Sequence, residues 1–298
     1  MQCNAISIFN SVHLTHEFNV LLHYYSHYTG YLFLQNTAFS GKLPPTFPPG
    51  LVELDIANSL ITGSLDGAAF ENLSSLRFLL MDGVQFDSSI PSEIASLPNL
   101  EYFFAIDAMI TGDLSYMESM PVIFEHWVDR NPQLGGQIPS FLGSLTTLQS
   151  FSIADCGFTG TIPESLGNLG LMQQMWLYKN QLSGEVPASM GRLSFMRIFE
   201  VEGNNLSDSM PESICENFST GMLEVLGADC DKLDVSFGSS SSSVVVVVII
   251  VIASSKFSFH SSSRSTLSNF FRCSYFPLSL VPVLHVLLHG RVPRRELG

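Results

Sequence analysis

Positive charge is scarce in this 298-residue chain. Lysine and arginine number 13 against 27 aspartates and glutamates, and the formal net charge is −14. The imbalance lies in residues 1–237, which carry a net charge of −19, while residues 238–298 carry +5. Proteins that bind nucleic acid neutralise its phosphates with basic side chains, so the acidic part of the chain is predicted not to bind nucleic acid.

Cysteine is scarce too, and catalytic motifs are absent. The five cysteines include no CxxC pair, which excludes a disulfide-dense scaffold and the common zinc sites built on such pairs. The sequence contains no GxSxG, HExxH, GxxxxGK[ST] or GxGxxG motif and no protein-kinase signature. We therefore predict no catalytic residues, no metal site and no cofactor, in a protein that is not an enzyme.

Long apolar runs are also lacking. The run Val244–Ala253 would span about 15 Å as a helix, half of the hydrocarbon core of a bilayer. Residues 1–28 contain no Lys or Arg, so the positive start of a secretory signal is missing. We predict a poorly specified leader over 1–28 and a low-complexity, disordered tail over 238–298, for which mistranslated flanking sequence is the alternative. Membrane association is expected only through segments that are not evident in this sequence.

What the chain does have is a period. Three blocks of 24 residues align: LQSFSIADCGFTGTIPESLGNLGL from Leu148, MQQMWLYKNQLSGEVPASMGRLSF from Met172 and MRIFEVEGNNLSDSMPESICENFS from Met196. Their shared frame is LxxLxLxxNxLxGxIP followed by xxLxxLxx. Other copies begin at Tyr31 (incomplete), Leu51, Leu76, Leu100 and Ile123, the last with one extra residue. Such a period predicts a solenoid of seven to eight stacked units.

The LxxLxL part of each unit predicts a strand. Its apolar residues alternate, so one face of the strand is buried and the intervening residues point outward. The side chains predicted to point inward are Leu54, Ile56, Leu79, Met81, Phe103, Ala105, Phe151, Ile153, Met175, Leu177, Phe199 and Val201. A slip of one residue would expose all of them, so the register is well determined.

The turns of each unit have signals of their own. An asparagine stands where the chain leaves the strand in three units: Asn131, Asn180 and Asn204. We expect these amides to bond the backbone of the turns, and Cys156 to take the same place in its unit as a structural rather than a reactive thiol. Val84 and Ala108 cannot bond in this way, so looser turns are expected there. Glycines that permit positive φ follow the turn in six of the units, at Gly41, Gly63, Gly112, Gly136, Gly160 and Gly184.

This frame resembles the plant-type leucine-rich-repeat family, in the subtype with LxGxIP in each unit, over about residues 29–230. The resemblance implies an α/β solenoid: a right-handed horseshoe or arc in which each unit adds one strand to a parallel concave sheet. We predict leucine-rich repeats over 29–214 and a C-terminal cap over 215–237. A disulfide between Cys215 and Cys230 would close this cap, and two buried thiols are the alternative.

The outward residues of the predicted strands form a stripe on the concave face. Both tryptophans of the chain share one outward position. The predicted ligand-binding residues are Phe78, Leu80, Tyr102, Phe104, Ile106, Trp127, Trp176 and Tyr178, rimmed by Asp82, Asp107, Glu125, Asp129, Glu200 and Glu202. Exposed aromatic patches are typical of binding interfaces. The alternative is that these side chains only pack against one another along the sheet.

These observations predict a non-enzymatic recognition protein whose concave sheet binds a protein, peptide or glycan. By resemblance, the chain is the ectodomain, or a fragment, of a receptor-like protein that is extracellular or on the cell surface. Two alternatives stay open. One is a secreted inhibitor of a glycan-degrading enzyme, similar to plant inhibitors built on this repeat, and the other is a structural wall or matrix protein.

Overall fold

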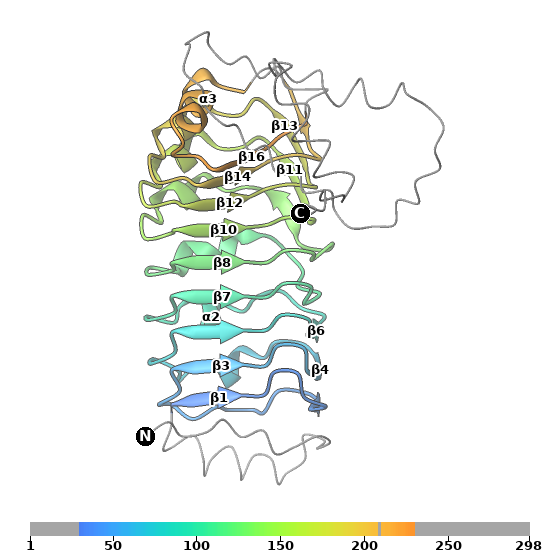
Figure 1. Ribbon diagram of the computed structural model, residues 1–298. Helices are drawn as coiled ribbons and strands as arrows, with labels where there is room; N and C mark the ends of the chain where they lie inside the picture. Colours follow the sequence, from blue (N-terminus) through green and yellow to red (C-terminus); the bar gives the residue numbers. More distant parts are fainter. Residues whose placement is uncertain (1–29, 208–209, 230–298) are drawn as a thin grey trace, which may run out of the picture.

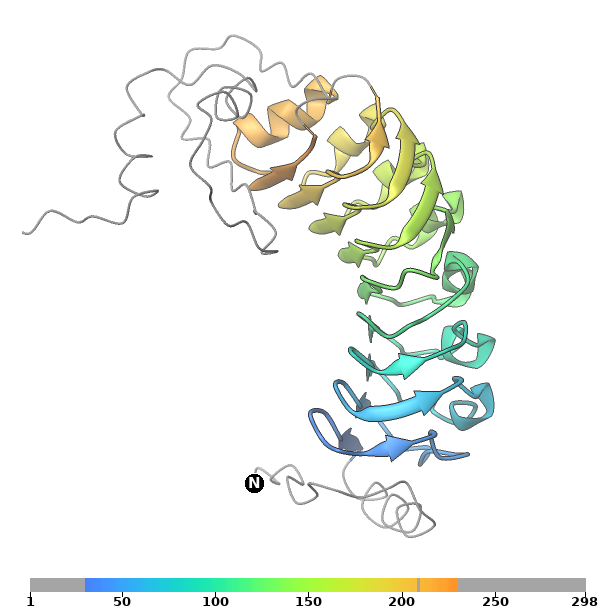
Figure 2. The ribbon, with the colours of Figure 1, turned by 90° about the vertical axis from the view of Figure 1, so that its right-hand side faces the viewer.

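Short parallel strands stack into a long curved sheet in the computed structural model, which describes residues 30–207 and 210–229 (Figure 1). Turned by 90°, the stack is an arc with the long sheet on the inner, concave side and the helices on the outer, convex side (Figure 2). The predicted α/β solenoid is therefore confirmed. The predicted leader over 1–28, the tail over 238–298 and Cys230 lie outside the described residues.

Within the described residues the concave sheet has nine strands, each supplied by the next coil of the chain. Their order is β1 (Tyr31–Phe33), β3 (Glu53–Asp55), β5 (Phe78–Leu80), β7 (Tyr102–Phe104), β8 (Glu125–Trp127), β10 (Ser150–Ser152), β12 (Gln174–Trp176), β14 (Ile198–Glu200) and β16 (Val225–Gly227). The sequence predicted seven to eight units. The additional strand is β16, which pairs in parallel with β14 because the predicted cap continues the alternating pattern through Leu226.

Short helices cover the convex side. They are η1 (Gly67–Ala69), α2 (Ser92–Ala95), η2 (Leu114–Ser119), η3 (Ser140–Ser144), η4 (Glu164–Asn168), η5 (Ala188–Arg192) and α3 (Glu212–Ser219). Five of them begin directly after a proline, whose fixed φ holds the extended residue that precedes the first turn. The other two begin after Asp66 and Asp113, whose carboxylates accept hydrogen bonds from Ala68 N and Ser115 N.

A second set of strands joins the two sides of the arc and is interrupted near its middle. One sheet contains β2 (Ser40–Gly41), β4 (Leu60–Gly63) and β6 (Gln85–Phe86). The other contains β9 (Gly135–Gln137), β11 (Gly157–Gly160), β13 (Gln181–Gly184) and β15 (Asn205–Leu206). Between them the coil with Ala108 has only an isolated bridge, Gly112 to Leu134, and a second left-handed residue at Met109. The ladder of strands is thus interrupted after Ala108, whereas β6 forms after Val84. Because the backbone N–H of Ala108 donates to Asn131 Oδ1, the looser turns expected at Val84 and Ala108 stay a prediction.

The interior follows the predicted alternation. Every side chain predicted to point inward is buried, with at most 1% of its surface exposed. The hydrogen bonds predicted between the asparagine amides and the backbone of the turns are also confirmed. Asn180 accepts a hydrogen bond from Phe158 N and donates to the carbonyl oxygens of Ile153 and Leu177, so each amide joins its own turn to that of the preceding coil. Cys156 donates to Val128 O at 3.3 Å in the same place.

Candidate functional site

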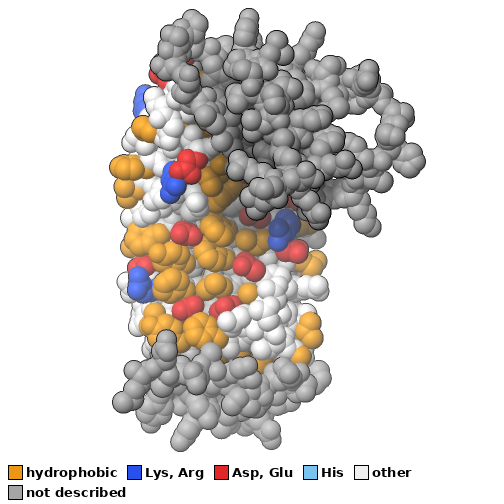
Figure 3. All heavy atoms as spheres, viewed as in Figure 1, with side chains coloured by type: hydrophobic (Ala, Val, Ile, Leu, Met, Phe, Trp, Pro, Cys, Tyr) orange, Lys and Arg blue, Asp and Glu red, His pale blue; other side chains and the backbone are white. Residues whose placement is uncertain are grey.

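The concave face is built from the outward residues of the nine-stranded sheet. In β5, β7, β8, β12 and β14 the middle residue is buried and the residues on either side point to the concave surface. A third outward residue follows two positions later, while the chain still bonds to the next coil. These three positions in successive coils give three rows of side chains that run along the arc. Orange apolar side chains gather in the middle of this face, with red carboxylates among them (Figure 3).

The apolar side chains of these rows form one group, which we call the aromatic stripe. Its members are Phe78, Leu80, Tyr102, Phe104, Ile106, Trp127, Trp176 and Tyr178, and all of them are half-buried. Phe78 stacks on Tyr102 with ring centroids 4.6 Å apart and planes 8° apart. Phe104 stacks on Trp127 at 4.6 Å and 22°. Neighbouring rings thus support one another and still have surface in contact with solvent.

The two tryptophans meet over a strand of small residues. Ser152 of β10 is the register partner of both Trp127 and Trp176, because β10 lies between β8 and β12. Since the serines leave room above β10, the indole rings reach across it and contact edge to face, with centroids 5.7 Å apart and planes at 83°. Trp127 Nε1 donates to Ser150 Oγ at 2.8 Å. Both serines are buried, at 3% and 2% exposed. The contact between the indoles makes the aromatic stripe continuous from β5 to β12.

The acidic residues of the face differ in how they are held. Asp82 Oδ1 accepts a hydrogen bond from Ile106 N at 2.8 Å. Asp129 Oδ1 accepts one from Ala154 N at 2.8 Å and a very short one from Ser152 Oγ. Each of these aspartates therefore joins two coils. Glu202 Oε2 is buried and has no hydrogen-bond partner among the described residues.

The carboxylates of the face are destabilised in their charged form by partial burial. Burial raises the pKa of Asp82, Asp129, Glu125, Glu200 and Glu202 above the usual values, because partial desolvation disfavours the charged form. Like-charged neighbours add to this rise: Asp55 for Asp82, Asp82 for Asp129, Glu202 for Glu200 and Asp229 for Glu202. The face thus holds negative charge that its surroundings only partly stabilise.

The structure brings together nearly all of the residues predicted for the site. The extra residue of the coil at Ile123 falls in the turn between Asn131 and Leu134, after β8, so it leaves Trp127 in the same row as Trp176. Asp107 is the exception. It is exposed in a left-handed turn, with φ of 54°, one residue past the third row. Whether these residues bind a ligand stays a prediction.

One residue with no place in the sequence prediction lies beneath the aromatic stripe. His126 takes the inward position of β8, where the other coils have Leu, Phe or Met, and it is fully buried. Its Nε2 is 2.8 Å from the hydroxyl of Tyr116, and its ring stacks on Phe103. The signal was available in the sequence, since HxV replaces LxL at this point of the period.

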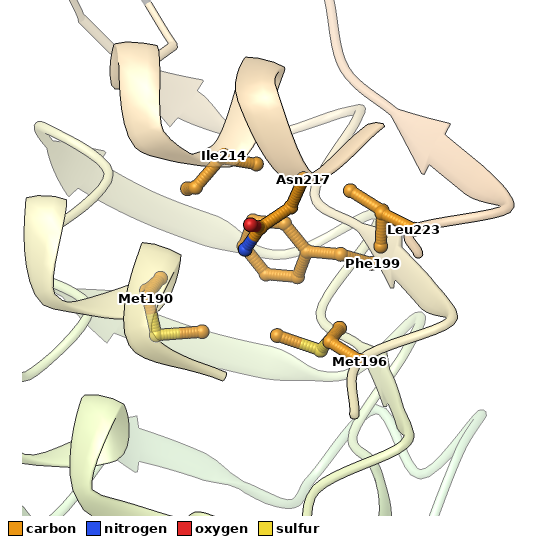
Figure 4. Close-up of a pocket in the computed structure, with 6 residues that line it drawn as sticks. All are labelled: Met190, Met196, Phe199, Ile214, Asn217 and Leu223. Atoms are coloured by element: carbon orange, nitrogen blue, oxygen red, sulfur yellow. The ribbon is translucent and has the colours of Figure 1, made fainter. Parts of the chain in front are cut away.

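No other feature of the described residues offers a site for chemistry. None of their His, Cys, Asp and Glu side chains form a group able to hold a metal ion. A small cavity between η5 and α3 is lined by Met190, Met196, Phe199, Ile214, Asn217 and Leu223 (Figure 4). Its volume of about 10 Å³ holds at most one water molecule. In residues 30–207 and 210–229, no helix has both the length and the hydrophobicity to cross a membrane.

Comparison with protein families matches one part of the repeat array. The family model described as Leucine Rich Repeat matches residues 147–169, which include β10, β11 and η4. The search of curated proteins gave no match.

Solved structures are similar to a larger part of the chain. A structure of the Arabidopsis receptor kinase HAESA in complex with the peptide hormone IDA and the co-receptor SERK1 has a TM-score of 0.65 and 28% identity, over 76% of this chain and 39% of that one. The leucine-rich-repeat ectodomain of the Arabidopsis membrane receptor kinase GASSHO1/SCHENGEN3, in complex with CASPARIAN STRIP INTEGRITY FACTOR 2, has a TM-score of 0.60 and 26% identity, over 66% of this chain and 23% of that one. The structure of the plant peptide hormone receptor RGFR1 in complex with RGF2 shares the fold. Its TM-score is 0.62 and its identity is 24%, over 66% of this chain and 32% of that one. The chain therefore spans 23–39% of the length of these solved chains.

Proposed function

Because this chain is a leucine-rich-repeat protein of the plant type, we propose that it is the ligand-binding part of a receptor-like protein. Its concave sheet binds an extended segment of a peptide or protein through the aromatic stripe. Binding takes place outside the cell or at its surface, as the ectodomains among the similar solved structures suggest.

The observation that carries this proposal is the continuity of the aromatic stripe. Eight apolar side chains, four of them Trp or Tyr, lie together on a sheet face that no helix covers within the described residues. Contiguous apolar patches of this kind are uncommon on monomers, and Trp and Tyr are the residues that most often anchor interfaces. Binding by the stripe therefore accounts for an apolar surface that lies outside the buried core of the solenoid.

The packing of the rings against one another is compatible with ligand binding and favours it. The stacked pairs Phe78–Tyr102 and Phe104–Trp127 restrict the rotamers of their rings before any ligand arrives. A preformed surface loses less side-chain entropy on binding than a mobile one. Part of each ring remains exposed, so a ligand can still remove apolar surface from water.

The dimensions of the face suit an extended segment. From β5 to β14 there are five steps between neighbouring strands. At about 4.8 Å a step this distance is roughly 24 Å, which an extended chain covers with about seven residues. The peptide hormones in the HAESA and RGFR1 structures are ligands of those proteins, and the proposal extends this class of ligand to the present chain.

Selection from a peptide library tests the proposal. Phage-displayed random dodecapeptides are selected on the immobilised protein, and each enriched sequence is then measured on the double variant Trp176→Ala/Tyr102→Ala. We expect enriched peptides to lose at least tenfold in affinity on this variant, because two anchors of the stripe are truncated.

A matched control separates the stripe from general surface hydrophobicity. Leu171→Ala/Phe195→Ala removes two apolar side chains that are 47% and 61% exposed and lie just before β12 and β14. This variant should bind the enriched peptides as the wild type does. No enrichment, or equal loss on both double variants while far-UV circular dichroism shows intact folding, would contradict the proposed function.

A further inference from the structure

The outward rows of the concave sheet carry charge of one sign only. Along the three rows of the described strands there are eight carboxylates and no lysine or arginine. The carboxylates belong to Glu53, Asp55, Asp82, Glu125, Asp129, Glu200, Glu202 and Asp229. An anionic partner would be repelled from such a face, and a cationic one would be attracted to it.

The carboxylates are concentrated around the two tryptophans. Glu125 stands two residues before Trp127 on the outward face of β8, and Asp129 stands two residues after it. On the far side of the indole pair, Glu200 of β14 is the register partner of Trp176. The edge-to-face indoles are thus flanked by carboxylates at both ends, which is a combination that binds ammonium and guanidinium groups.

The chain's own cations neutralise this face only in part. Arg130 interacts electrostatically with Asp82 and Asp129, and Lys179 interacts with Glu202. Both cations belong to left-handed turns at the edge of the sheet, where each is exposed. The pKa of each of the three carboxyl groups is raised nonetheless, mainly by desolvation, so negative charge on the face remains poorly stabilised. A cationic ligand would relieve this cost.

We propose that the segment bound by the concave sheet is cationic, with an arginine or lysine side chain lying against Trp127 and Trp176 and its charge facing Glu125, Asp129 and Glu200. This inference rests on the proposed function and names the chemistry of its ligand. The stem of the basic side chain covers the indole surface while its charged end reaches the carboxylates.

The test uses three fluorescently labelled dodecapeptides that differ only at every third residue. One is four repeats of Gly-Leu-Arg, the second has citrulline in place of every arginine, and the third has glutamate there. Citrulline keeps the shape of arginine without its charge. Fluorescence anisotropy with the full chain in 0.15 M salt should show the arginine peptide binding at least tenfold tighter than the citrulline peptide, and no binding of the glutamate peptide.

Two variants with the same net charge locate the effect. Glu125→Gln/Glu200→Gln removes two carboxylates beside the indoles, whereas Glu118→Gln/Glu164→Gln removes two exposed ones on η2 and η4 of the convex side. The arginine peptide should bind at least fivefold more weakly to the first variant and unchanged to the second. Asp129 is left intact because it bonds Ala154 N and Ser152.

The outcomes separate this inference from the proposed function. Equal weakening by both double variants would show attraction to the overall negative charge and would overturn the site. Binding of the citrulline or glutamate peptide as tightly as the arginine peptide, with loss on Trp176→Ala, would overturn the cationic ligand and leave peptide binding intact. If none of the three peptides binds, the cationic ligand is overturned, and the library selection decides the proposed function by itself.

Discussion

Removing the buried histidine is expected to change how the stability of this solenoid depends on pH. His126 is fully buried against Phe103 and Phe151, and Nε2 of its ring is paired with the hydroxyl of Tyr116. Burial lowers the pKa of His126 to about 3, because a charged imidazolium would lose its hydration without gaining a carboxylate partner. The unfolded chain, by contrast, takes up this proton near pH 6.5.

The sign and size of the effect follow from proton linkage. Above pH 6.5 the ring is neutral in both states, so it has no effect on the free energy of unfolding. Between pH 6.5 and 3, His126 is protonated only in the unfolded chain. As the pH is lowered through this range, the free energy of unfolding falls by about 1.4 kcal/mol per pH unit, or about 2 kcal/mol by pH 5. The concave carboxylates act in the opposite direction, because a raised pKa in the folded state means that lower pH favours folding. A difference between two variants therefore isolates the histidine.

The comparison is between Tyr116→Phe and Tyr116→Phe/His126→Met. Methionine is the residue at the same inward position of β12, and phenylalanine at 116 avoids leaving a buried hydroxyl without a partner. Urea unfolding followed by circular dichroism from pH 7.5 to 4.5 gives both free energies. For each pH unit below 6.5, the free energy of unfolding of the double variant should rise by about 1.4 kcal/mol relative to that of the single variant. A difference that stays constant over this range would refute the reasoning.

Three further predictions concern the scaffold. Asn180→Ala should lower the free energy of unfolding by about 2–4 kcal/mol, because it leaves buried backbone groups of two coils without partners. The control is Gln181→Ala at the exposed neighbouring residue, which should change the free energy of unfolding by less than about 0.5 kcal/mol in the same urea titration. Gly184→Ala should lower the free energy of unfolding by about 1–2 kcal/mol, since φ is 78° there. Gly170→Ala should be neutral or slightly stabilising, because there is open space around the added carbon. Equal effects of the two substitutions on stability would contradict the turn geometry. Burial raises the pKa of Cys156 to about 12, so N-ethylmaleimide at pH 8 should label this thiol in urea and leave it unmodified in the folded protein, as peptide mass mapping can show.

Most of the fold could be predicted from the sequence because the signal is local and repeated. A strand with one buried face needs apolar residues two apart, and a turn with positive φ favours glycine. Each coil therefore contains the signals for its own geometry, and the next coil repeats them. The inward position of Met175 and the role of Asn180 followed from that period alone. The prediction was weakest where a coil departs from the pattern. The period does not predict a polar residue such as His126 at an inward position, and the strand β16 lies within the predicted cap.

The period of the sequence thus determined which side chains point inward, which point outward and how the coils stack, because those choices depend on backbone geometry within one unit. It could not determine which outward side chains touch. Trp127 and Trp176 are 49 residues apart, and they meet only because β10 between them carries serines and because each ring takes one of several rotamers. The pairing of His126 with Tyr116, and the part-buried carboxylates beside the indoles, likewise depend on distances between coils, which only the tertiary structure decided.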